Sequence, residues 1–294
     1  MDKYDFCLAW NWEYDRDFVT MLAEACGSKG AALLQVTPGN LSEVLEALSQ
    51  RRLTFQVFMD RASDQDAGYL PLVDWASRQC AYYFNCHDKA CSTRNKAQMH
   101  YSLIHAGLQT PFTIMLPSYQ DQPDFSPTDL HKLGQPFVIK PAHGGEGKGV
   151  MIDASHLNQV LDVRQEYPSD QYLLQANIVP RELGTHRAWF RVIYCTGEVY
   201  PCWWDQRTHL YTPVSTEEER QYELSPLRVA AGTIAKLSGL DIFSTEIAFT
   251  TEGLFVVVDY VNDMIDLRVQ SKVVDGVPDE LVREIAGRLV AVSH

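Results

Sequence analysis

A glycine-rich segment in the middle of the chain constrains the fold more than any other feature. Four glycines stand among residues 144–149, in the sequence Pro-Ala-His-Gly-Gly-Glu-Gly-Lys-Gly that begins at Pro141. Glycine loses more backbone entropy on folding than any other residue, so such a run indicates a tight bend or the close approach of a ligand. Successive backbone N–H groups in a loop of this kind form a concave anion site, to which Lys148 would add a positive charge. The composition by itself also fits a flexible hairpin tip.

The segments on either side of the loop limit which nucleotide fold can hold it. The apolar run 136–140 precedes the loop and ends in Lys140, and a second strand-like run, 150–153, follows it. A Walker A loop and a Rossmann turn both lead into a helix, which this pattern does not predict. The glycine loop of a protein kinase also joins two strands, but its lysine comes after the loop, and the chain has no His-Arg-Asp or Asp-Phe-Gly triplet. The pattern here is a strand ending in lysine, a glycine loop and a strand.

Strands and helices alternate over the first ninety residues. The sequence predicts strands at 4–10, 31–36 and 53–59, with helices at 15–25 and 41–48. This alternation is typical of βαβ crossovers and of a parallel sheet covered on both faces, which is an α/β arrangement.

The second half of the chain is expected to be α+β and largely antiparallel, because turn-like residues join its strand pairs. Its expected strands are 112–116, 172–178, 188–195, 198–204, 244–250 and 254–261, and its expected helices are 93–106 and 278–290. The polar segment 205–222 is long for a hairpin connection and is either a lid or a solvated charged loop.

Charge and composition exclude several classes of protein. The 294 residues include 25 Lys and Arg against 38 Asp and Glu, a net charge of −13 that argues against a nucleic-acid partner. No stretch approaches the roughly 20 apolar residues of a membrane span. The seven cysteines are scattered and odd in number, and the first fourteen residues do not form the apolar core of a signal peptide. A soluble, cytoplasmic protein is therefore expected.

The order of the motifs resembles that of the ATP-grasp superfamily, in particular its RimK-like and glutathione-synthetase-like carboxylate-amine ligases. The segment 95–111 looks like the first lysine helix with its turn, and 136–149 matches the second lysine strand with its glycine loop. The segment 173–178 looks like the adenine hinge, 191–199 like the arginine strand, and 239–262 like the paired carboxylate strands. The resemblance implies an N-terminal doubly wound domain and two α+β subdomains that clasp ATP. The expected divisions are 1–93, 94–180 and 181–294.

The same resemblance implies which residues would bind ATP and Mg²⁺. The expected ATP-binding residues are Lys96, Lys140, Gly144, Gly145, Gly147, Lys148, Gln175, Ala176 and Ile178. Magnesium prefers oxygen ligands and keeps several waters, so few side chains are needed. The expected magnesium ligands are Glu246, Asp259 and Asn262. The expected catalytic residues, whose planar guanidinium groups would clamp phosphate or a substrate carboxylate, are Arg191, Arg207 and Arg268. Arg187 and Arg207 fit a surface ion pair equally well.

The metal motif departs from the family pattern in its spacing. Members usually have Glu-x-Asn, whereas Asp259 and Asn262 are three positions apart and would face opposite sides of a regular strand. A β-bulge at 260–261 could bring them together. The Pro-Gly that usually follows the asparagine is absent, which leaves Asp263 and Asp266 as alternative ligands.

The resemblance implies a ligase reaction. A substrate carboxylate attacks the γ-phosphate to give an acyl phosphate and ADP, and an amine then displaces phosphate to form an amide; small amino-acid or peptide-like molecules are the expected partners. One alternative is a small-molecule kinase that stops after phosphorylating a hydroxyl. Another is an ATP-binding module that has lost turnover, which the irregular metal spacing keeps open. Dimers are common among members of the superfamily, and the oligomeric state, a homodimer included, is left open.

Overall fold

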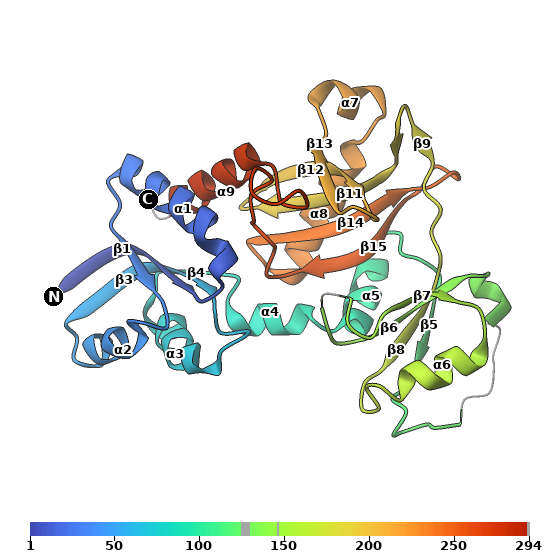
Figure 1. Cartoon of the computed structure of the whole chain (residues 1–294), viewed down its shortest axis with the longest axis horizontal. Coiled ribbons are helices and arrows are strands. Elements are labelled where there is room, and N and C mark those ends of the chain that lie inside the picture. The colour runs from blue at the N-terminus through green and yellow to red at the C-terminus, as the bar shows by residue number, and fades with distance from the viewer. Residues whose placement is uncertain (125–129, 146, 293–294) are drawn as a thin grey trace.

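Three β-sheets with covering helices make up the protein (Figure 1). The computed structural model describes residues 1–124, 130–145 and 147–292. A further pair of short strands, β9 (Glu182–Leu183) and β10 (His186–Arg187), lies between the second and third sheets in the sequence. Short 3-10 helices lie at Glu13–Asp15, Ala67–Tyr69 and Leu130–Leu133.

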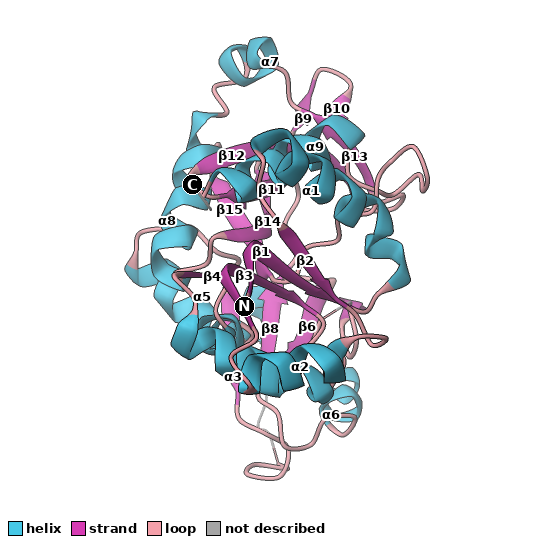
Figure 2. Ribbon diagram, turned by 90° about the vertical axis from the view of Figure 1, so that its left-hand side faces the viewer, coloured by secondary structure: helices cyan, strands magenta, loops and turns pink. Residues whose placement is uncertain are grey.

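The first sheet is parallel, with the strand order β2-β1-β3-β4, as the alternating pattern predicts. Its strands are β1 (Asp2–Trp10), β2 (Leu33–Val36), β3 (Leu53–Arg61) and β4 (Tyr82–Phe84). The helices around it are α1 (Arg16–Lys29), α2 (Leu41–Ser49), α3 (Leu70–Gln79) and α9 (Asp279–Ala291). Side chains of β1 alternate between two cores: Phe6 and Leu8 pack with α1 and α9, whereas Cys7 and Ala9 pack with α2 and α3. Figure 2 shows these helix pairs on opposite faces of the sheet.

The second sheet is antiparallel, with the order β5-β8-β6-β7. Its strands are β5 (Thr113–Leu116), β6 (Phe137–Pro141), β7 (Met151–Ala154) and β8 (Tyr172–Ala176), and the helices that contact it are α5 (Lys96–His105) and α6 (Leu157–Arg164). The helix α4 (His87–Thr93) leads from the first sheet to α5. β6 and β7 pair as a hairpin, so the glycine segment joins two strands as expected. The helix expected at 93–106 begins at Lys96, because the Asn95 side chain caps it by accepting the Gln98 N–H.

The third sheet is also antiparallel, in the order β13-β12-β11-β14-β15. Its strands are β11 (Trp189–Cys195), β12 (Glu198–Asp205), β13 (Leu210–Pro213), β14 (Ile242–Phe249) and β15 (Phe255–Asn262), and its helices are α7 (Thr216–Gln221) and α8 (Ser225–Ser238). α8 packs its apolar side against this sheet in one core. The antiparallel second half is therefore as predicted.

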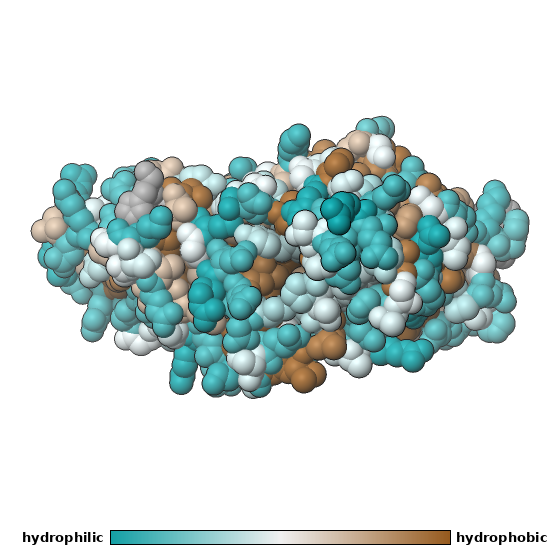
Figure 3. All heavy atoms as spheres, turned by 90° about the horizontal axis from the view of Figure 1, so that it is seen from above, coloured by the Kyte–Doolittle hydropathy of each residue, from teal (hydrophilic) through white to brown (hydrophobic). Residues whose placement is uncertain are grey.

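The segment 205–222 is not a solvated loop throughout but contains regular secondary structure, and its role as a lid stays a prediction. It forms an edge strand, β13, which pairs with the end of β12, and then the helix α7, whose first turn is capped by Ser215. Hydrophilic side chains cover most of the face seen in Figure 3, with apolar residues in small groups among them. None of the helices within the described ranges is both long and apolar enough to cross a membrane.

Candidate nucleotide and metal site

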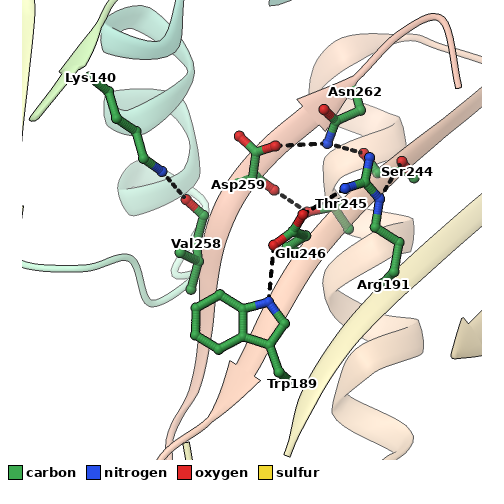
Figure 4. A network of polar contacts seen from close by, with 9 residues as sticks. All are labelled: Lys140, Trp189, Arg191, Ser244, Thr245, Glu246, Val258, Asp259 and Asn262. Atoms are coloured by element: carbon green, nitrogen blue, oxygen red, sulfur yellow. Dashed lines mark hydrogen bonds and ion pairs between the residues drawn. The ribbon is translucent and has the colours of Figure 1, made fainter. Parts of the chain in front are cut away.

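The three expected magnesium ligands lie on neighbouring strands. Glu246 on β14 pairs directly with Asp259 on β15, and Ser244 pairs with Asn262. Between these two pairs β15 has one residue more than β14, which is a bulge at 260–261. As a result the Asn262 Nδ2 donates to Asp259 Oδ2 across 2.9 Å (Figure 4). The bulge that the spacing requires is present, and it brings together two side chains that a regular strand would separate.

A second irregularity in β15 lies on the other side of Asp259. Ile247 pairs with Val257, so Val258 is an extra residue on β15. Backbone groups that leave the ladder need other partners when they are buried. Here side chains supply them: Thr245 Oγ1 donates to the Asp259 carbonyl at 2.8 Å, and Lys140 Nζ donates to the Val258 carbonyl at 3.2 Å.

Arg191 stands beside Glu246 on the adjoining strand, β11. Its Nη1 donates to Glu246 Oε1 at 2.6 Å and its Nε donates to Ser244 Oγ at 3.1 Å. The second Glu246 oxygen accepts the Trp189 Nε1–H at 3.0 Å, so both oxygens of this carboxylate are oriented (Figure 4). The Arg191 guanidinium also lies 5.3 Å from the centre of the Trp204 ring. Sequence reasoning missed Trp189 and Trp204 as supports, because their partners lie on other strands.

Cations determine the charge state of Asp259. Burial would raise the pKa of its carboxyl, but Lys140, Arg191, the Asn262 hydrogen bond and Lys96 outweigh burial and hold the pKa below its usual value. Burial lowers the pKa of Lys96, an effect that Asp259 opposes and Lys140 strengthens. The structure therefore brings two lysines, an arginine and two carboxylates into one electrostatic cluster.

Two hydrogen bonds from Lys96 connect the start of the glycine loop to the first residue of α5. The Lys96 N–H donates to the Ala142 carbonyl at 2.8 Å, and Lys96 Nζ donates to the Gly144 carbonyl. Gly144, Gly145, Gly147 and Lys148 are exposed, and Glu146 lies outside the described residues. Gly144 has a φ of +123°, a conformation that side-chain-bearing residues rarely adopt. The exposed loop thus begins next to Lys96 and ends on β7.

The three residues of the expected adenine hinge, Gln175, Ala176 and Ile178, differ in whether they belong to the paired part of β8. Gln175 is buried in β8, where its Nε2 donates to Thr113 Oγ1 at 3.1 Å and to the Tyr260 hydroxyl at 2.7 Å. The Ala176 N–H donates to the Phe112 carbonyl. Ile178 follows the end of β8 and is half-buried. Of the three expected adenine contacts, only Ile178 lies beyond the strand pairing.

Among the residues that the structure describes, the other two expected catalytic arginines make no hydrogen bond to this cluster. Arg268 Nη2 pairs with Asp266 at 2.7 Å and Asp275 at 3.0 Å, and these hydrogen bonds and charges raise its pKa. Arg207 is exposed in the turn between β12 and β13. Within the described residues, neither side chain hydrogen-bonds to Arg191 or Glu246. Arg187, the other candidate, lies 3.9 Å from Glu182 in an exposed ion pair.

The donor set suits Mg²⁺ bound together with phosphate. Glu246, Asp259 and Asn262 offer carboxylate and amide oxygens, which this ion prefers, and it commonly completes its shell with substrate phosphates and water. In the described part of the chain no three His, Cys, Asp or Glu side chains are grouped to hold a metal by themselves. The two alternative metal ligands, Asp263 and Asp266, have other partners. Asp263 accepts from Asn85 Nδ2 at 2.6 Å, and Asp266 accepts from Arg268.

A small pocket lies where the parallel sheet meets the start of β14 and the end of β15. Its lining includes Asp60 at the end of β3, Asn85 after β4, Arg94 after α4, and Asp263 after β15. Ligands of open α/β sheets bind beyond the carboxyl ends of the strands, which is where this pocket opens. Burial raises the pKa of Asp263 to about 6, and the exposed Arg94 beside it opposes this rise.

Solved structures share this architecture, although no protein-family model and no curated protein matches the sequence. A RimK domain ATP-grasp protein from Sphaerobacter thermophilus DSM 20745 matches with a TM-score of 0.64 and 20% identity, over 97% of this chain and 98% of that one. The macrocyclase MdnC from Microcystis aeruginosa MRC, bound with precursor peptide MdnA, matches with a TM-score of 0.65 and 10% identity, over 98% and 99%. D-alanine–D-alanine ligase from Bacillus anthracis, complexed with ATP, matches with a TM-score of 0.62 and 14% identity, over 100% and 98%. The fold expected from the motifs is confirmed: the chain has the ATP-grasp fold.

Proposed function

We propose that the protein is an ATP-dependent ligase that joins a carboxylate to an amine through an acyl phosphate and releases ADP and phosphate. The observation that carries this proposal is the convergence of Lys96, Lys140 and Arg191 on Asp259 and Glu246 beside the glycine loop. An acidic protein must neutralise a triphosphate locally, and this cluster provides the cations and the metal ligands together. The solved ligases that share the fold, including one complexed with ATP, support the same reaction class.

The residues of the chain would act mainly by positioning and by neutralising charge. Lys96 and Lys140 would contact phosphate oxygens, and Lys140 would exchange the neutral Val258 carbonyl for a charged partner. Arg191 would hold the transferred phosphoryl group with its planar guanidinium. Glu246, Asp259 and Asn262 would hold Mg²⁺, which supplies charge neutralisation at the phosphates. A substrate carboxylate is already ionised at neutral pH, so the first step needs no general base.

The pocket at the end of the parallel sheet is the proposed place for the carboxylate substrate. It opens beside Asp263, the residue that follows the metal ligand Asn262, and Arg94 offers a cation at its lining. Its free volume of about 30 Å³ has room for one small polar group of an amino-acid or peptide-like substrate, not for the whole molecule. The macrocyclase bound with a precursor peptide supports a peptide-like substrate for this fold.

The reaction class is tested by measuring ADP release and product mass with pairs of amino acids and short peptides. Amide formation that requires two co-substrates is expected, whereas one phosphorylated product would indicate a kinase, and no ADP release with any pair would indicate a binding module.

Lys140→Ala tests the nucleotide site directly. Loss of a charge-assisted contact to phosphate should weaken ATP binding at least about tenfold. Lys29→Ala, which removes an exposed lysine at the end of α1, is the matched control and should leave the affinity unchanged. Calorimetry with a non-hydrolysable ATP analogue measures both, and an unchanged affinity in folded Lys140→Ala would refute the assignment.

A further inference from the structure

Tyr260 occupies the bulge that brings Asp259 and Asn262 together. It is one of the two residues between them, and its side chain is only 3% exposed. A bulge interrupts the ladder hydrogen bonds that hold a regular strand, so other contacts must fix its shape. In β15 the carbonyls of Val258 and Asp259 are held by Lys140 and Thr245. Tyr260 is held through the hydrogen bonds of its side-chain hydroxyl.

The Tyr260 hydroxyl makes two buried hydrogen bonds, one to α5 and one to β8. It lies 2.6 Å from His100 Nδ1 on α5 and 2.7 Å from Gln175 Nε2 on β8. Gln175 is itself fixed by its second N–H, which donates to Thr113 on β5. His100 and Gln175 are both buried. The hydroxyl therefore connects the bulge to one helix and two strands that contribute no magnesium ligand.

These contacts have a geometric consequence for the metal ligands. Asp259 and Asn262 flank the bulge, so a shift in the backbone at 260–261 changes the distance between their side chains. Without the bulge, residues three positions apart on a strand point to opposite faces. Partners that orient metal ligands from behind commonly affect metal affinity strongly, even though they do not touch the ion.

We propose that Tyr260 is a positioning residue for the magnesium site, and that its hydroxyl, held by His100 and Gln175, keeps the β15 bulge in the form that turns Asp259 and Asn262 toward each other. The inference rests on the proposed function, because it assumes that these two side chains hold the metal. It also explains how Asp259 and Asn262, three positions apart, can replace the pair two positions apart that the family usually has.

Tyr260→Phe tests the inference, because it removes only the hydroxyl. Tyr172→Phe is the matched control: Tyr172 is equally buried, and its hydroxyl donates to the Val163 carbonyl at 2.8 Å, away from β15. His100→Phe removes the imidazole that bonds to the Tyr260 hydroxyl but keeps a ring in its place. It provides a second variant if Tyr260→Phe does not fold. Two quantities are measured in each protein: Mn²⁺ affinity in the presence of ADP, from the electron paramagnetic resonance signal of free Mn²⁺, and ADP affinity in excess EDTA, by calorimetry.

The expected result separates metal binding from nucleotide binding. Mn²⁺ affinity should fall at least about tenfold in Tyr260→Phe and in His100→Phe, while ADP affinity in EDTA stays unchanged and Tyr172→Phe resembles the unmodified chain. Unchanged Mn²⁺ affinity in the folded variants would overturn the inference, and so would an equal loss of Mn²⁺ and metal-free ADP affinity, which indicates a general structural role. If the unmodified chain binds neither ADP nor Mn²⁺, the proposed function fails together with the inference.

Discussion

At the scale of single residues, buried polar groups in the candidate site are paired with one another. Asp259 keeps a lowered pKa although it is buried, because Lys140 and Arg191 outweigh the cost of burial. Removing one member of such a set leaves its partner buried without compensation, which costs more than the pair itself contributes. His100 and Tyr260, which lie behind the site, are also buried polar groups paired with each other, but without a charge.

His100 makes stability depend on pH. Burial lowers the pKa of His100 below its ordinary value of 6.5. The unfolded chain therefore binds a proton at this position more readily than the folded protein, so stability is lost as the pH falls through about 6.5 toward the lower folded-state pKa. Urea unfolding between pH 7.5 and 5.5 should show a steeper loss in the unmodified chain than in His100→Phe. Identical slopes would show that His100 does not titrate on unfolding.

At the scale of elements, local signals predicted the strand–glycine loop–strand unit and missed the parts held by distant contacts. The strand that ends in Lys140, the glycines and the following strand are adjacent in sequence, so their pattern is readable. The helix α8 was not among the expected elements, although Pro226 near its start and Gly239 just after its end are helix signals in the sequence. The Tyr260–His100 contact joins residues 160 positions apart and has no local signal.

The β6–β7 hairpin depends on the last glycine of its loop. Gly149 has a φ of +70°, and a Cβ there would lie 2.6 Å from Cε2 of Tyr167. Gly149→Ala should therefore lower the free energy of unfolding by about 1 kcal/mol or more, because alanine is strained at positive φ and must also displace the ring. Gly145→Ala is the control in the same loop, since nothing lies within 4 Å of its added Cβ, and its effect should stay within about 0.5 kcal/mol. Thermal and urea unfolding of the two variants measure the difference, and equal stabilities would contradict this account.

At the scale of the whole molecule, the two ends of the chain share one hydrophobic core. Phe6 and Leu8 of β1 and Phe18 of α1 pack in the same cluster as Leu281, Ile285 and Leu289 of α9. Ile193 and Cys195 of the third sheet belong to it as well. Periodicity predicted α9 as an amphipathic helix, but the identity of its packing partner depends on the tertiary fold and could not be read from the pattern. The first sheet is thus held against the strands that carry the candidate metal site.

Arg61 forms a buried ion pair within the parallel-sheet part of the chain and also contacts the segment that follows β15. Arg61 at the end of β3 contacts Asp15 before α1 at 2.6 Å, with side chains 3% and 2% exposed, and its Nη2 donates to the Ile265 carbonyl beyond β15 at 3.1 Å. Arg61→Met leaves the Asp15 carboxylate buried without a partner, so the free energy of unfolding should fall by about 3–5 kcal/mol. The double variant Asp15→Leu with Arg61→Met removes both charges and should recover a large part of that loss, since apolar replacements of a buried pair are often close to neutral. Urea unfolding of both variants measures this, and a double variant no more stable than Arg61→Met would show that the lost contact to Ile265, rather than the unpaired Asp15 charge, causes the loss of stability.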